Sequence, residues 1–367
     1  MYPELLYQLA LTLIPNIGPV QAKILLQQFD APDIFKAKKR ELEKIEGIGT
    51  IRAESIKSFC DFSKAEEEIA FIEKYKIKPL FITHTDYPRR LLNCYDSPTL
   101  LYYKGEAALN SEKVIAIIGT RSHTDYGKQI TEKLIEELAE QNVVVISGLA
   151  HGIDAIAHKA ALKNNLLTVG VLAHGLDQVY PSQHTGLAKD MLKSGGGLLT
   201  EFRSKSKPDK HNFPTRNRIV AGMSDATIVV ETGIKGGSMI TAELANNYNK
   251  DVFAFPGKVT DAKSAGCNYL VKNNKAVLLT DARELIELMS WEEMSQKSKV
   301  RSQRELFIEL SDDEKIIIAI LKEKNSVHID EINHKSGLSS SSVAAAILNL
   351  ELQNVVLSLP GKQYQIT

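Results

Sequence analysis

The sequence predicts an α/β protein whose central domain is a doubly wound, Rossmann-like parallel sheet. From about residue 114, short apolar runs recur without polar alternation, which is typical of strands that are covered on both faces. Segments with helical periodicity separate these runs and can serve as right-handed crossovers. Before about residue 75 and after about residue 310 the helical pattern dominates, so smaller helical domains are expected to flank the sheet.

Residues 1–75 are expected to form a helical domain of the SAM or helix-hairpin-helix kind. Two glycine turns, Ile14–Pro19 and Ile45–Gly49, each precede residues with helical spacing. In a helix-hairpin-helix unit such glycines let the first amides of a helix approach a DNA phosphate. Asn16 stands where the first turn would have its first glycine, which weakens that turn as a phosphate clamp. Because such pairs also serve as packed scaffolds, DNA contact and a purely structural role both stay open.

The Rossmann-like domain is assigned to residues 76–290. Helices are expected at 127–141 and 153–164, through Lys193, and at 281–289. The predicted strands alternate with these and further helices, and they read VIAIIG, VVVISG, LLTVGVLA, GLLTEF, ATIVVET, DVFAFPG and AVLLT.

A polar segment of mixed charge, residues 291–309, is predicted to be a linker, and residues 310–367 are predicted to form a winged helix. Three short amphipathic helices are expected there, followed by a hairpin. The expected recognition helix, 339–353, contains no Arg or Lys, and Lys362 in the hairpin is the only obvious cation of the wing. We therefore expect this domain to pack or to contact protein, and whether it senses duplex DNA stays open.

The composition describes an ordinary globular protein and excludes several classes. The chain has 367 residues, 43% of them hydrophobic and 25% charged, and its formal net charge is zero. A neutral chain has no global attraction to nucleic acid, so any such site has to be a local patch. No apolar stretch is long enough for a bilayer, and Met1–Gly18 lacks the features of a signal peptide, so no membrane contact is expected. Cys60, Cys94 and Cys267 are isolated, which favours reduced thiols and a cytoplasmic protein.

The most strongly basic segment runs from Arg203 to Arg218. It holds six cations against a single Asp209, and Phe213 lies between its lysines and its last two arginines. A single-stranded nucleic acid needs cations for its phosphates and a flat ring for an unstacked base, and this segment offers both. A solvated lysine-rich loop is the simpler alternative.

Three predicted loops follow strands at the same edge of the sheet. The first contains Arg121 ahead of a helix that begins near Thr124, the second begins with Ser147 and Gly148, and the third reads GGS at 236–238. Helix N-termini and successive glycine amides attract anions at such an edge. Each loop could also be an ordinary strand-to-helix turn, but three of them beside the basic segment favour one shared anion site.

The standard nucleotide and catalytic fingerprints are missing from these loops. Neither the G-x-G-x-x-G nor the P-loop spacing is present, so no cofactor is predicted. Ser147, His151 and Asp154 are so close in sequence that they rarely attain the geometry of a catalytic triad. The spacing of His151 and His158 matches no common metal site. We therefore predict neither catalytic residues nor a metal.

In combination and order, the motifs of the central domain resemble the DprA (Smf) family of DNA-processing proteins. These motifs span roughly residues 81–289 and read YPRRLLNCYDSPTLLYYKG, IAIIGTR, VISGLAHGIDAIAH, NFPTRNRIVAG and GGSMITAELA. Members of the family bind the single-stranded DNA that enters during natural transformation, protect it and load the RecA recombinase onto it, without known catalysis. The resemblance implies the same function and partners here, in a homodimer built through the Rossmann domain. Candidate dimer strands lie near 252–255 and 277–279.

The resemblance also implies roles for single residues. Arg121 matches an arginine that contacts phosphate, Lys210 a lysine in the family's DNA pocket, and Phe213 an aromatic residue that stacks on a base. Ser97 departs from the pattern, because the family usually has a second proline there. By the same motif match, further neighbours of the strand are expected to be Ser147, Gly148, Arg216, Arg218, Gly237 and Ser238.

An enzyme is the alternative function. The GGSMITAE loop is also similar to that of nucleotide-monophosphate phosphoribohydrolases, which share a related Rossmann core and place a glutamate beside the glycosidic bond. Glu243 would be that glutamate here. A third possibility is an interaction scaffold that uses the terminal domains and leaves the Rossmann pocket without function.

Overall fold

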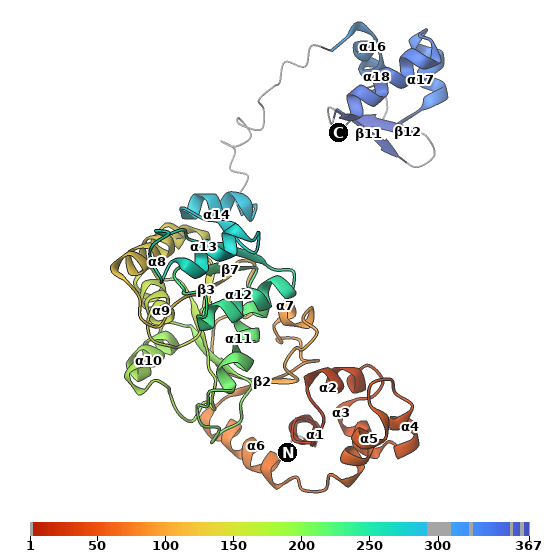
Figure 1. The fold of residues 1–367 in the computed structure, drawn as a ribbon. Helices are drawn as coiled ribbons and strands as arrows, with labels where there is room; N and C mark the ends of the chain where they lie inside the picture. The colour runs from red at the N-terminus through yellow and green to blue at the C-terminus, as the bar shows by residue number, and fades with distance from the viewer. Residues whose placement is uncertain (1–2, 292–309, 323–325, 353–354, 360–362, 367) are drawn as a thin grey trace. The chain divides into compact units, whose positions relative to one another are not determined.

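A nine-stranded sheet organises the first part of the chain (Figure 1). The computed structural model describes residues 3–291, 310–322, 326–352, 355–359 and 363–366. It divides into two compact units, Met1–Trp291 and Glu292–Thr367. The predicted linker falls almost wholly outside the described residues, which end at Trp291 and resume at Leu310.

The sheet is parallel over most of its width. Its order is β1-β2-β6-β5-β4-β3-β7-β8-β9, and every neighbouring pair from β6 to β9 is parallel, whereas β2 is antiparallel to both β1 and β6. The seven predicted strands are all present, and β1 and β2 extend the sheet at one edge. The bounds are β1 (Lys78–Phe81), β2 (Leu100–Gly105), β3 (Val114–Ile118), β4 (Val144–Ser147), β5 (Thr168–Val171), β6 (Gly197–Thr200), β7 (Ala226–Val229), β8 (Asp251–Ala254) and β9 (Val277–Leu278).

Helices cover both faces of the sheet, which confirms the doubly wound fold. On β3, Ile115 and Ile117 pack with α8, α9 and α14, while Ala116 and Ile118 pack with α11, α12 and α13. This alternation follows from the pleat, which turns successive side chains to opposite faces. The bounds are α7 (Arg89–Leu92), α8 (Asp125–Glu137), α9 (Ile153–Lys163), α10 (Thr185–Lys193), α11 (Asn212–Met223), α12 (Gly237–Asn247), α13 (Ala265–Lys272) and α14 (Ala282–Leu288).

The predicted N-terminal helices are present, and an arginine joins their two glycine turns. Arg52 donates from Nε to the carbonyl of Asn16 (3.2 Å) and from Nη1 to the carbonyl of Gly47 (3.0 Å). Asn16 has a positive φ, which asparagine tolerates better than most residues, so it can replace the missing glycine. The bounds are α1 (Pro3–Leu11), α2 (Pro19–Leu26), α3 (Ala31–Lys36), α4 (Lys39–Glu43), α5 (Gly49–Ser58) and α6 (Ser63–Tyr75).

The second unit has the predicted winged-helix elements. Its described part contains three helices and a sheet of order β10-β12-β11, built around the buried side chains of Ile317, Ile332 and Val343. Lys362 lies outside the described residues. No helix of the described chain has the length and apolar character that crossing a membrane demands. The bounds are α16 (Asp312–Leu321), α17 (Ile329–Ser336), α18 (Ser340–Leu352), β10 (Val327–His328), β11 (Val356–Leu359) and β12 (Gln363–Ile366).

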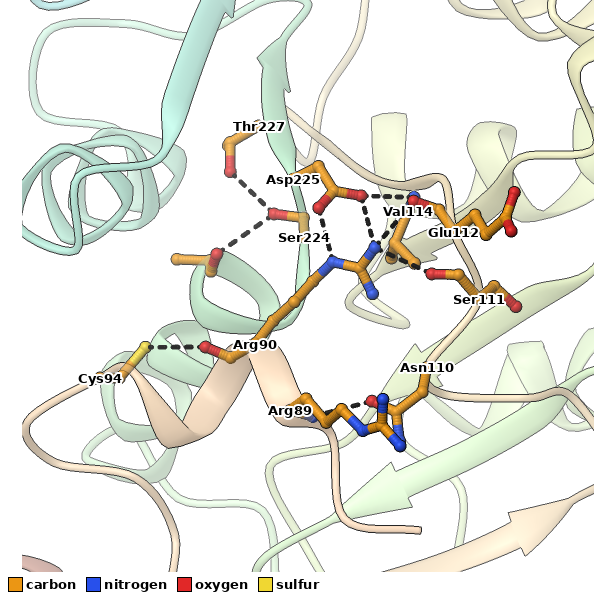
Figure 2. A network of polar contacts seen from close by, with 11 residues as sticks. Arg89, Arg90, Cys94, Asn110, Ser111, Glu112, Val114, Ser224, Asp225 and Thr227 are labelled. Carbon is orange, nitrogen blue, oxygen red and sulfur yellow. Dashed lines mark hydrogen bonds and ion pairs between the residues drawn. The ribbon is translucent and has the colours of Figure 1, made fainter. Parts of the chain in front are cut away.

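Figure 2 shows how Arg90 of α7 ties the segment between β1 and β2 to the starts of β3 and β7. Its Nε and Nη2 atoms donate to the two carboxylate oxygens of Asp225, at 2.6 and 2.8 Å. Nη2 also donates to the carbonyls of Ser111 and Glu112, and Asp225 accepts from the amide of Val114 (2.9 Å). Such a two-pronged, partly buried pair is both stronger and more directional than a surface ion pair.

A buried histidine holds the loop that follows β4. His158 of α9 is fully buried, and its Nε2 lies 2.6 Å from the carbonyl of Gly148. Because a carbonyl only accepts, Nε2 carries the proton. Nδ1 lies 2.6 Å from the hydroxyl oxygen of Thr168, which also contacts the carbonyl of Val145 (2.9 Å). Burial lowers the pKa of His158 to about 4, so the ring is neutral at physiological pH.

We predict that Arg90→Ala lowers the free energy of unfolding by about 2 kcal/mol, because it leaves the partly buried carboxylate of Asp225 without its charged partner. Urea unfolding checks this. Arg89→Ala is the matched control: the residue belongs to the same helix but its side chain is exposed, so a change within about 0.5 kcal/mol is expected. Equal losses in the two variants would contradict the assigned role of Arg90.

We predict that stability falls as the pH drops from 7 to 5, and that His158 causes part of this. Unfolding frees the ring to bind a proton with its ordinary pKa near 6.5, whereas the folded ring resists protonation down to about 4. The stabilisation is therefore complete above about pH 6.5, and on the order of 2 kcal/mol is lost by pH 5. Chemical unfolding across this range should show a flatter dependence for His158→Gln, and identical slopes would contradict the prediction.

Candidate nucleic-acid interface

A pocket of about 690 Å³ opens where β3 and β7 lie side by side. From β3 the chain continues to β4 on one side, and from β7 it continues to β8 on the other, so the two loops separate at the carboxyl ends of the strands. Ligands of open α/β sheets bind at such a switch point. The pocket is lined by 118–121 at the end of β3, by Gly148 and Ala150 after β4, by members of the basic segment, and after β7 by Thr232, Gly233, 236–238, Ile240 and Thr241.

The second half of the basic segment is helical and presents one face to this pocket. Helix α11 begins at Asn212, and besides Pro214 in its first turn the residues of this helix that line the pocket are Phe213, Arg216, Asn217 and Val220. These positions are three or four residues apart, which places them on one side of a helix. The alternative interpretation of this segment as a solvated lysine-rich loop therefore applies only to residues before 212.

The three groups on which the expected site depends converge here. Arg121, Lys210 and Phe213 all line the pocket, Arg121 and Lys210 are exposed, and Phe213 is half-buried. The guanidinium carbon of Arg121 lies 5.1 Å from the centre of the Phe213 ring, within the range of a cation–π contact. The ring of Tyr180 lies on a further loop at the same edge, 6.1 Å from that of Phe213.

The floor of the pocket contains a buried pair of opposite charges. Arg216 is 6% exposed and Asp154, in the first turn of α9, is 9% exposed. Burial lowers the pKa of Arg216 and raises that of Asp154, and in each case the charge of the other residue opposes the shift. A side chain at Gly148 would collide with the ends of both side chains, so it would have to displace this buried pair. Arg216 and Asp154 thus form a buried, charged part of the pocket wall.

The third loop places the start of α12 at the pocket. Gly237 is exposed, and Ser238 is buried except for the part that faces the pocket, where both residues belong to the lining. The Ser238 hydroxyl donates to Oγ1 of Thr232 (2.7 Å), so it orders the loop. The first amides of an α-helix have no acceptor within the helix and attract anions, which suits a phosphate at this position.

Two residues expected beside the strand do not line the pocket. Ser147 is fully buried, does not line the pocket, and donates to the carbonyl of Ile117 (2.6 Å). Arg218 is buried in an ion pair with Glu201 and is likewise absent from the lining. Residues two apart on a helix point in different directions, so Arg216 and Arg218 cannot act as a pair.

The helix after β3 does not offer its N-terminus to an anion, contrary to expectation. The carboxylate of Glu231 already lies there and accepts from the amide (2.9 Å) and the hydroxyl (2.8 Å) of Thr124. Glu231 therefore stabilises the start of α8 through its dipole. Arg121 contributes to the pocket independently of this helix end.

The remaining lysines of the basic segment lie outside the main pocket, in a loop held by α6. Glu68 is buried and accepts from both the amide (2.9 Å) and the hydroxyl (2.6 Å) of Ser204. The neighbouring Glu67 forms an exposed ion pair with Lys205 (3.0 Å). The loop ahead of Lys210 is thus fixed at one end by the N-terminal helices.

The glutamate that an enzyme would need is not at the pocket. Glu243 is exposed on α12, forms an ion pair with Lys275 (3.6 Å), and is absent from the lining. The enzyme alternative therefore loses the residue on which it depended.

Sequence reasoning missed two residues of the site. Asp154 was considered only beside Ser147 and His151, because its partner Arg216 is distant in sequence. Tyr180 follows β5, whose carboxyl end lies at the same edge as those of β3 and β4. The same reasoning, that parallel strands end at one edge of the sheet, also places Tyr180 at this site.

Sequence comparisons agree with this architecture in all parts of the chain. The profile of the family described as DNA recombination-mediator protein A matches residues 78–290, a helix-hairpin-helix motif matches 6–69, and the DprA winged helix domain matches 304–362. Protein Smf from Synechocystis is 32% identical over 99% of this chain and 98% of its own length. DNA processing protein DprA from Streptococcus pneumoniae is 36% identical over 62% of this chain and 84% of its own length.

Solved structures give the same result. DNA processing protein A from Streptococcus pneumoniae superposes with a TM-score of 0.65 at 30% identity, covering 77% of this chain and 95% of that one. DNA processing protein A from Helicobacter pylori, solved for its single-stranded DNA binding mode, gives 0.53 at 31% identity, covering 59% and 96%. This chain therefore belongs to the family of DNA recombination-mediator protein A, whose members carry the names DprA and Smf.

Proposed function

We propose that this protein binds single-stranded DNA in the pocket between β3 and β7. The observation that carries the proposal is the convergence of Arg121, Lys210 and the Phe213 ring on one pocket. The two cations hold phosphates, the ring stacks on a base, and the first amides of α12 add neutral donors. None of these groups reads a base edge, so little sequence preference is expected.

The same geometry favours single strands over duplexes. A base can stack on Phe213 only when it is free of its partner, because the ring lies inside the pocket. The buried Arg216 and Asp154 offset each other's charge, which leaves Arg121 and Lys210 as the principal contacts to phosphate. Two such contacts give a salt slope of about −1.4 per protomer, taking roughly −0.7 for each.

The role in the cell is proposed from the family. The Helicobacter pylori relative has a single-stranded DNA binding mode, and other relatives are named as DNA processing proteins. We propose that this chain likewise acts in natural transformation, in the cytoplasm, where it protects the incoming strand and loads RecA onto it without catalysing a reaction.

A homodimer belongs to the same proposal. Of the two candidate strands, 252–255 is largely buried in the sheet and cannot serve as the contact, which corrects that expectation. Val277 and Leu278 on the edge strand β9 are exposed and stay candidates. Two pockets on one strand would increase the affinity beyond that of either pocket alone.

We predict that Phe213→Ala and Lys210→Ala each weaken binding of single-stranded oligonucleotides. Loss of one stacked base costs about 1–3 kcal/mol, so Phe213→Ala should raise Kd by roughly fivefold or more. Lys210→Ala should also reduce the salt slope by about 0.7. Fluorescence anisotropy across a salt series measures both effects, with a duplex of the same sequence in parallel.

Lys189→Ala provides the control, because this exposed lysine of α10 lies outside the pocket. Its Kd should stay within about twofold of the wild type, since distant surface changes have small effects. Wild-type affinity in both pocket variants would contradict the proposal. Release of free base from nucleoside monophosphates would instead revive the enzyme alternative.

We predict that Glu68→Ala weakens single-strand binding by about three- to tenfold although Glu68 touches no strand. Its loss releases Ser204 and lets the loop ahead of Lys210 move, and ordering that loop again on binding costs entropy. The salt slope should not change, because no phosphate contact is lost. Glu67→Ala, which removes only an exposed pair, should bind as the wild type does, and equal affinities for both variants would refute the anchoring role.

A further inference from the structure

A second hollow adjoins the main pocket on the side of the basic loop. Its volume is about 520 Å³, and Tyr180 and Pro208 line both it and the main pocket, so the two are adjacent. Its other lining residues are Asp177, Gln178, Lys205 and Lys207.

The charge available in this hollow is positive. Lys207 is exposed, and its ammonium has no ion pair or hydrogen bond among the described residues. Lys205 pairs with Glu67, but both side chains are mostly exposed, so solvent weakens that pair. The one acid of the lining, Asp177, accepts from the backbone amide of Lys205 (3.0 Å) and keeps its charge, so the lining carries two cations against one acid.

An aromatic ring stands between the two spaces. Tyr180 is 50% exposed, and its ring is tilted by 48° to that of Phe213 with their centres 6.1 Å apart. The amide of Tyr180 donates to Nε2 of the buried His174 (3.2 Å), which fixes the backbone beneath the ring. Arg121, Phe213, Tyr180 and the two lysines therefore follow one another along a continuous surface.

We propose that this hollow is a second nucleotide site for the same DNA strand. Tyr180 stacks on a further base and Lys207 holds its phosphate, so the strand runs from the start of α12 past Phe213 and Tyr180 to the basic loop. Alternating rings and cations along a groove are the arrangement that binds single strands without regard to sequence. The inference rests on the proposed function of the main pocket, and it assigns the path of the strand beyond it.

Oligothymidylates of different lengths test the inference. A trinucleotide fills the main pocket alone, whereas a 15-mer also reaches the hollow. Lys207→Ala should raise Kd for the 15-mer at least about threefold, reduce its salt slope by about 0.7, and leave the trinucleotide within twofold of the wild type. Tyr180→Ala should raise Kd for the 15-mer by about fivefold or more, and Tyr180→Phe, which keeps the ring, by less than twofold.

The outcomes separate this inference from the proposal beneath it. The second site is overturned if Lys207→Ala and Tyr180→Ala both bind the 15-mer as the wild type does while Phe213→Ala still weakens binding. An equal loss for both lengths in Lys207→Ala also overturns it, because the lysine would then serve the main pocket. If Phe213→Ala and Lys210→Ala bind as the wild type does, the proposed function itself fails. Lys189→Ala again serves as the control for nonspecific loss of charge.

Discussion

The site depends on one topological constraint: β3 and β7 are neighbours in a parallel sheet, yet their chains leave in opposite directions. Two loops that separate in this way cannot fill the space above the strands, so a hollow remains at their carboxyl ends. Helix α11 then crosses beside this hollow and supplies one face of side chains to it. The backbone is constrained at Gly148, where a side chain would displace Arg216 and Asp154, and at Gly152, which has a positive φ and lies against the backbone of Thr120 and Arg121.

Buried charges hold this framework in place and leave a few cations for a ligand. The ion pair of Arg90 with Asp225 joins α7 to the starts of β3 and β7. Arg218 anchors α11 through its ion pair with Glu201, and the carboxylate of Glu231 binds the start of α8. Burying a charge is costly unless a partner compensates it, so each of these groups is tied to one position. Arg121 and Lys210 are exposed and have no such partner among the described residues, which makes them available for phosphates.

Sequence reasoning worked where the signal was local. The apolar runs of β3–β9 predicted the sheet. Because parallel strands end at the same edge, three loops could then be placed at one site. It failed where contacts join residues that are distant in sequence. The local sequence gives no sign that Arg218 pairs with Glu201 or that Ser204 is bound by Glu68. Ser147, the last residue of β4, was assigned to a loop. No bounds were predicted for α11, although proline, here Pro214, is well tolerated in the first turn of a helix.

Photochemical cross-linking of the full chain to a single-stranded oligonucleotide that contains 4-thiothymidine tests the central claim most directly, with the linked peptides located by mass spectrometry. The account predicts that cross-links concentrate in four segments that surround one pocket: 118–121, 148–150, 208–217 and 232–241. Cross-links confined to the helices before residue 76 or to the winged-helix unit, with these four segments unmodified, would contradict it.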